Sequence, residues 1–239
     1  RLAELDKVVR DGYAAYEFQK VQQSLFNFCS GDLSAFFFDA RKDALYCDDA
    51  GSLRRRPTRP AMEALCARLT TWYAPILPFT AEDVWLERFP GDDSSVHLVD
   101  FPETPAEWRD DALAAAWAGA RKVRSVVTGA LEIERREKRI GASLEARPKV
   151  WLDPVAADFA RYALVPRMSA AAFADLCITS DIEVVEGVGP ADAFRLADVP
   201  GVAVEPLRAE GGKCGRCWKV LPEVTAEGAL CGRCSGAVG

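Results

Sequence analysis

The sequence lacks any apolar run that approaches the roughly 20 residues needed to span a membrane. Its first seven residues, RLAELDK, are charged and amphipathic, so they do not resemble a secretory signal. Positive charge is not in excess either, because 30 Lys and Arg stand against 36 Asp and Glu, giving a formal net charge of −6. These absences predict a cytoplasmic protein without a membrane partner. They also exclude a globally basic nucleic-acid-binding protein, although local basic segments are compatible with the balance.

Histidine is nearly absent, since His97 is the only one, and eight cysteines are few for a disulfide scaffold of 239 residues. A stand-alone hydrolase or transferase is disfavoured, because no nucleophile pairs with a histidine base. The chain contains no internal repeat and no low-complexity segment. Its length is enough for one or two domains with a sizeable core.

The first 140 residues carry apolar side chains at helical spacing. Ser30-Gly31 interrupts the first of these patterns, and Asp32 is expected to cap a new helix. Thr80 and Asp83 resemble a capping box at the start of a later one. The expected helical segments are 2–28, 32–46, 61–76, 80–89 and 108–139. Five helices with short connections predict an α-helical bundle.

The pattern changes after residue 140, where alternating and β-branched residues predict strands at 143–152, 176–186 and 202–207, with a short helix at 154–162. Residues 141–208 are therefore expected to form a small α/β unit. The predicted fold class is mainly α, with domains at 1–140, 141–208 and 209–239.

The last thirty residues contain two Cys-x-x-Cys hooks separated by thirteen residues, Cys214 with Cys217 and Cys231 with Cys234. Four thiolates at this spacing predict one tetrahedral zinc site, with 220–224 and 229–230 as the strands of a hairpin between the hooks. A segment with so few apolar side chains needs metal binding to fold, and four cysteine ligands leave no open position for catalysis. Two disulfides would instead require an oxidising compartment.

Cations and one tryptophan surround the hooks. Side chains of this kind suit single-stranded RNA, because phosphates attract the cations and an unstacked base can stack on an indole. The candidate RNA-binding residues are Lys213, Arg216, Trp218, Lys219 and Arg233, with a second basic run at Arg54, Arg55 and Arg56. Packing of the indole on the zinc ribbon, and solvation of the charges, are equally compatible with the spacing.

Several segments resemble the bacterial isoleucyl-tRNA synthetase family. Residues 27–36 (NFCSGDLSAF), 42–47 (KDALYC) and 74–85 (APILPFTAEDVW) are similar to its anticodon-binding domain. Residues 141–146 (GASLEA) resemble the junction after that domain, and KCGRCW with CGRC resembles the family's C-terminal zinc segment. Valyl and leucyl relatives share the Pro-Phe-Thr stretch more loosely.

The resemblance implies that the whole enzyme attaches isoleucine to its tRNA at the expense of ATP. This chain has neither the His-Ile-Gly-His nor the Lys-Met-Ser-Lys-Ser type of signature. We therefore expect a C-terminal fragment without catalytic residues, with ATP and magnesium binding to the missing catalytic domain. The expected partners are the anticodon stem-loop of tRNA and the missing catalytic and editing domains.

Two alternatives remain open. The zinc ribbon is also compatible with a non-enzymatic module that binds another protein or the rest of its own chain. The chain is also compatible with the equivalent region of a valyl or leucyl relative.

Overall fold

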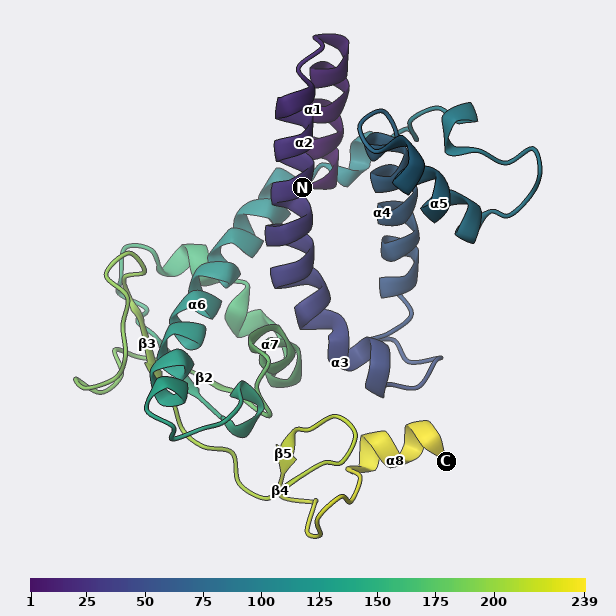
Figure 1. Cartoon of the computed structure of the whole chain (residues 1–239). Coiled ribbons are helices and arrows are strands. Elements are labelled where there is room, and N and C mark those ends of the chain that lie inside the picture. The colour runs from purple at the N-terminus through teal and green to yellow at the C-terminus, as the bar shows by residue number, and fades with distance from the viewer. The chain divides into compact units, whose positions relative to one another are not determined.

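The computed structural model describes residues 1–239 and divides them into two compact units. The first unit comprises residues 1–39 and 51–110, and the second comprises 40–50 and 111–239. Eight α-helices dominate, with a three-stranded sheet and a two-stranded ribbon in the second unit (Figure 1). The expected class, mainly α with a small α/β part and a cysteine-rich tail, is confirmed. None of the helices is long and apolar enough to cross a bilayer.

The first unit begins with two packed helices, α1 (Leu2–Ala14) and α2 (Phe18–Asn27). Tyr16 makes the turn between them in a left-handed conformation with φ of 59°. Gly12 allows their close approach, because a Cβ there would lie 2.6 Å from Cγ2 of Val21. The apolar pattern of residues 2–28 does not reveal this turn, since no glycine or proline marks it.

The helical backbone then continues without a break. A π-helix over Phe28–Phe38 follows α2 and leads directly into α3 (Asp39–Cys47). The expected interruption at Ser30-Gly31 and the capping role of Asp32 are therefore wrong. A glycine lowers helix stability by only about 1 kcal/mol, and the buried side chains on either side of it, Phe28 and Leu33, belong to the unit's core.

The remaining helices of this unit are α4 (Thr58–Tyr73) and α5 (Pro78–Arg88). The proposed capping box at Thr80 is wrong, because α5 begins two residues earlier, with Pro78 in its first turn, where a missing N–H is harmless. Short 3₁₀ turns at Val96–Leu98 and Ala106–Trp108 follow. The core contains these buried side chains: Leu5, Val9, Val21, Leu25, Phe28, Leu33, Leu65 and Trp72.

The second unit is built on α6 (Asp111–Arg136) and a three-stranded sheet. β1 (Lys149–Leu152) lies in the middle, parallel to β2 (Glu183–Glu186) and antiparallel to β3 (Val202–Glu205). α6 packs on β3, and its Gly119 lies so close to the 3₁₀ turn Phe159–Tyr162 that a Cβ would come 1.7 Å from the carbonyl oxygen of Arg161.

All three expected strands are shorter than predicted. Residues 143–145 form a 3₁₀ turn before β1, and residues 176–177 end a helix that was not expected, α7 (Ala170–Cys177). Ser169 caps α7 by accepting a hydrogen bond from the backbone N–H of Ala172 at 3.2 Å. A further 3₁₀ turn spans Val165–Arg167. The domain limits at 140 and 208 stay a prediction about which segments fold independently.

Candidate metal centre and nucleic-acid surface

The cysteine-rich tail consists of a two-stranded ribbon and a short helix. β4 (Gly212–Lys213) pairs antiparallel with β5 (Val220–Leu221), and α8 (Gly232–Val238) carries the last hook. The expected pairing of 220–224 with 229–230 is wrong, because the ribbon encloses the first hook rather than joining the two. Backbone hydrogen bonds within that hook, from Cys214 N–H to Lys219 O at 2.9 Å and from Trp218 N–H to Cys214 O at 3.1 Å, favour this shorter turn.

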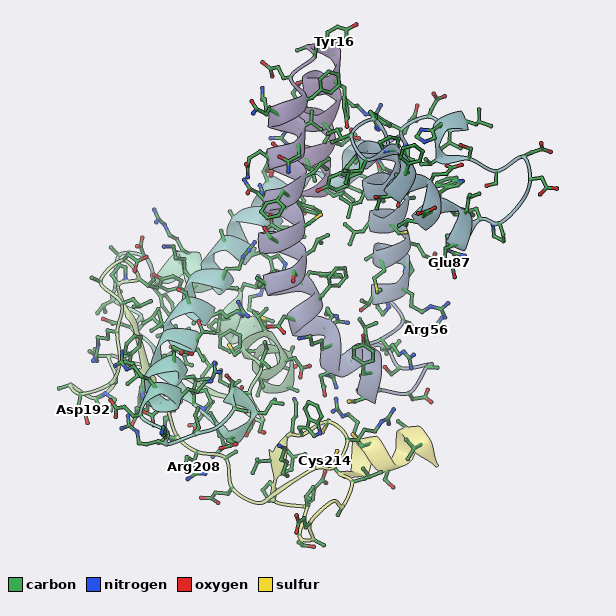
Figure 2. The ribbon with its side chains drawn as sticks, viewed as in Figure 1. Tyr16, Arg56, Glu87, Asp192, Arg208 and Cys214 are labelled. Atoms are coloured by element: carbon green, nitrogen blue, oxygen red, sulfur yellow. The ribbon has the colours of Figure 1, made fainter.

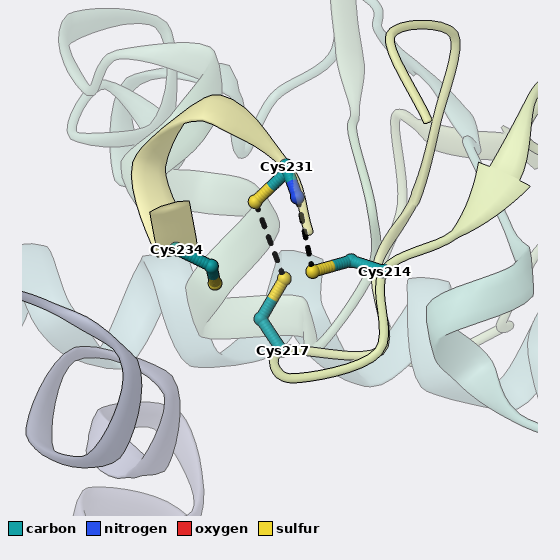
Figure 3. Close-up of side chains that lie close together, drawn as sticks. All are labelled: Cys214, Cys217, Cys231 and Cys234. Atoms are coloured by element: carbon teal, nitrogen blue, oxygen red, sulfur yellow. Dashed lines mark hydrogen bonds between the residues drawn. The ribbon is translucent and has the colours of Figure 1, made fainter. Parts of the chain in front are cut away.

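All four tail cysteines are buried, and their sulfur atoms lie within 4.8 Å of one another (Figure 3). The sulfurs of Cys217 and Cys231 are 3.8 Å apart. This distance is far longer than the roughly 2.05 Å of a disulfide bond. It matches the spacing of about 3.8 Å between ligands that lie about 2.3 Å from a tetrahedral zinc. The donor set and its geometry therefore fit a tetrahedral metal ion.

The thiols differ in how readily they ionise. Burial raises the pKa of Cys217 to about 11, and it also raises the pKa of Cys234. At Cys214, burial opposes ionisation too, but hydrogen bonds from backbone N–H groups outweigh it and lower the pKa to about 6. One of these donors is the N–H of Cys231, 3.3 Å from the Cys214 sulfur. A cation is therefore needed to convert the whole set to thiolates.

Two arginines of the hooks contact residues 40–50. Arg233 donates to both carboxylate oxygens of Asp43, one of them at 2.7 Å, and to Asp48 at 3.0 Å. Arg216 donates to the carbonyl oxygen of Tyr46 at 3.0 Å. Cys47 packs against the four-cysteine cluster. The end of α3 is thus a wall of the candidate metal centre.

Lys219 contacts a different part of the same unit. Its ammonium lies 2.8 Å from Asp175 of α7, and each side chain is only 11% exposed. The next residue, Val220, donates its backbone N–H to the hydroxyl of Ser180 at 2.6 Å. These contacts join the ribbon to the segment that follows α7.

Trp218 and Lys213 face solvent instead. Trp218 is 60% exposed, and its backbone adopts a left-handed conformation with φ of 65°. The ammonium of Lys213, itself exposed, lies 5.8 Å from the centre of the indole. An exposed aromatic ring beside a cation is the arrangement that proteins use to bind an unpaired base and its phosphate.

The second basic run lies in the other compact unit. Arg54, Arg55 and Arg56 occupy turns that precede α4, and Arg55 donates its backbone N–H to the Ser52 hydroxyl at 3.1 Å. Figure 2 labels Arg56, which lies in this turn, and Cys214, which lies in the tail. RNA contact by these three arginines stays a prediction.

The carboxylates that pair with the tail's cations were not predicted from the sequence. Asp43, Asp48 and Asp175 lie between 44 and 190 residues from their partners along the chain. Each occurs in an ordinary helical or loop segment, so no local pattern distinguishes them.

Residues 1–150 match the model of the family described as the anticodon-binding domain of tRNA ligase. Because this match covers more than half of the chain, the protein belongs to that family of anticodon-binding domains.

The chain also resembles isoleucine–tRNA ligases in particular. It is 54% identical to those of Agrobacterium fabrum and Ruegeria pomeroyi and 49% identical to that of Brucella abortus, in each case over 224 residues. These matches cover 94% of the chain but only 22% of each relative. The chain thus spans about a fifth of the length of the ligases that it matches.

Proposed function

We propose that this chain is the C-terminal part of an isoleucine–tRNA ligase and that it holds the anticodon stem-loop of the tRNA. The family match over residues 1–150 carries the proposal, and the 54% identity to isoleucine–tRNA ligases supports the choice of amino acid. The whole enzyme would attach isoleucine to tRNA with ATP and magnesium bound in its catalytic domain, in the cytoplasm. This chain supplies no catalytic residue.

The four tail cysteines are proposed to hold one zinc ion with a structural role. Cys214, Cys217, Cys231 and Cys234 would fill a tetrahedral coordination sphere, which leaves no position for a reactive water molecule. The convergence of their buried sulfur atoms supports this assignment. The ion would supply folding free energy to a segment that has few apolar side chains.

Within the tail, Trp218 and Lys213 are proposed to contact the RNA, because both are exposed and adjacent. Arg216, Lys219 and Arg233 are instead assigned to holding the tail in place, since each donates to a protein oxygen. The turn with Arg54, Arg55 and Arg56 is proposed as a second phosphate-binding segment.

Equilibrium binding to two tRNAs tests the proposal. One is the isoleucine tRNA, and the other is the same molecule with its three anticodon bases replaced. We expect the replacement to weaken binding by at least about tenfold, since each lost hydrogen-bonded contact to a base edge is worth about 1–3 kcal/mol. Equal affinity for the two would overturn anticodon recognition and favour a protein-interaction role for the zinc ribbon.

A further inference from the structure

Arg233 occupies a particular position in the tail. It lies between Cys231 and Cys234 in the first turn of α8, so the positions of these two cysteines constrain the position of its backbone. Its guanidinium donates to Asp43 through two nitrogen atoms and to Asp48 through one. At the same end of α3, Cys47 packs against the four-cysteine cluster. Arg233 therefore belongs to the second hook through its backbone and contacts the end of α3 through its side chain.

The carboxylates make this contact energetically important. The side chain of Asp48 is 4% exposed and that of Asp43 is 20% exposed, while Arg233 is 28% exposed. A desolvated carboxylate is costly without a cation, so loss of Arg233 would remove a favourable charge-assisted contact from both carboxylates. The planar guanidinium can donate to both carboxylates in a fixed geometry that a lysine cannot reproduce.

The proposed metal site, in turn, would be stabilised by a nearby positive charge. Four thiolates around a divalent cation carry a net negative charge, which a nearby cation offsets. Arg233 carries its positive charge within the second hook, between Cys231 and Cys234. In return, a bound ion would hold the second hook in the position from which Arg233 reaches Asp43.

We propose that Arg233 is a positioning residue that couples metal binding in the tail to the docking of the tail on residues 40–48. This inference rests on the proposed metal site. Because the two events stabilise each other, the coupling must be reciprocal in free energy: loss of the ion weakens the docking of residues 40–48, and loss of the ion pairs weakens binding of the ion. The second hook would then be held more firmly on residues 40–48 while the metal is bound.

The first test measures zinc release from the whole chain to a colorimetric chelator. We expect Arg233→Ala to release zinc on the order of tenfold faster than the unmodified chain, as substitutions beside metal ligands commonly do. Arg147→Ala is the matched control, because Arg147 pairs with Asp181 at 2.9 Å in a solvent-exposed position of the same unit. Asp43→Asn leaves Arg233 in place and should also accelerate release, so the test stands even if Arg233→Ala disorders the tail.

The second test measures hydrogen exchange of residues 40–48 with and without zinc. In the unmodified chain, removing zinc should accelerate their exchange, whereas in Asp43→Asn it should have little further effect. Zinc release and exchange that match the Arg147→Ala control in both variants would overturn the coupling while leaving the metal site intact. An unmodified chain that binds no zinc would instead overturn the proposed metal site, and the coupling with it.

Discussion

At the scale of single residues, Trp218 is unusual because it combines an exposed indole with a left-handed backbone. A non-glycine residue in this conformation costs roughly 1–2 kcal/mol. The first hook imposes the conformation, since the N–H of Trp218 donates to Cys214 O at 3.1 Å. The fold therefore holds a large apolar side chain outward at some energetic cost, which supports a role in binding.

Replacing Trp218 with alanine should weaken tRNA binding by about 1–3 kcal/mol, the value of one base stacked on an aromatic ring. Trp218→Phe should retain part of this affinity, because phenylalanine still offers a stacking face. Fluorescence titration with isoleucine tRNA measures both variants, and zinc content serves as the control for folding. Loss of zinc from the alanine variant with unchanged affinity would show that the indole only packs on the ribbon.

The pair of Lys219 and Asp175 is expected to stabilise the protein. Because both side chains are only 11% exposed, Asp175→Ala should lower the free energy of unfolding by about 3 kcal/mol, the lower end of the range for breaking a buried pair. Urea denaturation followed by circular dichroism measures the change.

The control is Lys122→Ala, since Lys122 and Asp198 form an exposed pair at 2.9 Å. Its free energy of unfolding is expected to change by less than about 1 kcal/mol. Similar losses in both variants would contradict the structural role assigned to Lys219.

The convergence of the four cysteines was predictable from spacing alone, because two hooks a dozen residues apart can reach one ion. The roles of the cations around them were not predictable. In the sequence, Lys219, Arg233 and Lys213 are all basic residues close to the cysteines. Only the fold shows that Lys219 and Arg233 pair with carboxylates from distant segments.

At the scale of elements, the helical backbone from Phe18 to Cys47 is continuous through α2, the π-helix and α3. It contains Gly31, where an added Cβ would meet no atom within 4 Å and where the backbone does not require a positive φ. The glycine is therefore not needed for a turn or for close packing.

Gly31→Ala should consequently raise the free energy of unfolding by about 0.5–1 kcal/mol, because alanine favours the helix. Gly119→Ala is the contrasting variant and should be strongly destabilising, since its Cβ would collide with the backbone of Arg161. Thermal denaturation of both variants checks the pair. A marked loss of stability in Gly31→Ala would indicate a break in the helix at this position.

The limits of α4 and α6 were well predicted from their apolar periodicity, as both helices lie within three residues of the expected limits at each end. The short elements were predicted poorly. The last two residues of α7 were assigned to a strand, and the rest of this helix, which Ser169 caps, was not predicted. The ribbon's partner strand was missed because two residues, Gly212–Lys213, carry no apolar pattern.

At the scale of the whole molecule, the net charge of −6 means that binding to a polyanion must depend on local surfaces. Lys213 beside Trp218 belongs to one such surface. The logarithm of the tRNA association constant should fall linearly with the logarithm of salt concentration, with each phosphate contact contributing about 0.7–0.9 to the slope.

Lys213→Ala should reduce this slope by about 1, as expected for one lost phosphate contact. Filter binding at several potassium chloride concentrations measures the slope. Lys122→Ala is again the control, because its charge is paired with Asp198. An unchanged slope in the Lys213 variant would remove this lysine from the RNA surface.

A metal ion is proposed to organise the tail that presents Trp218. Native mass spectrometry of the reduced chain, recorded with and without zinc, checks this proposal. We expect one tightly bound zinc per chain, lost on replacing Cys231 with serine, with faster hydrogen exchange then confined to the tail and residues 40–48. A reduced chain that takes up no zinc, or whose tail exchanges equally slowly without it, would show that the metal does not organise the tail.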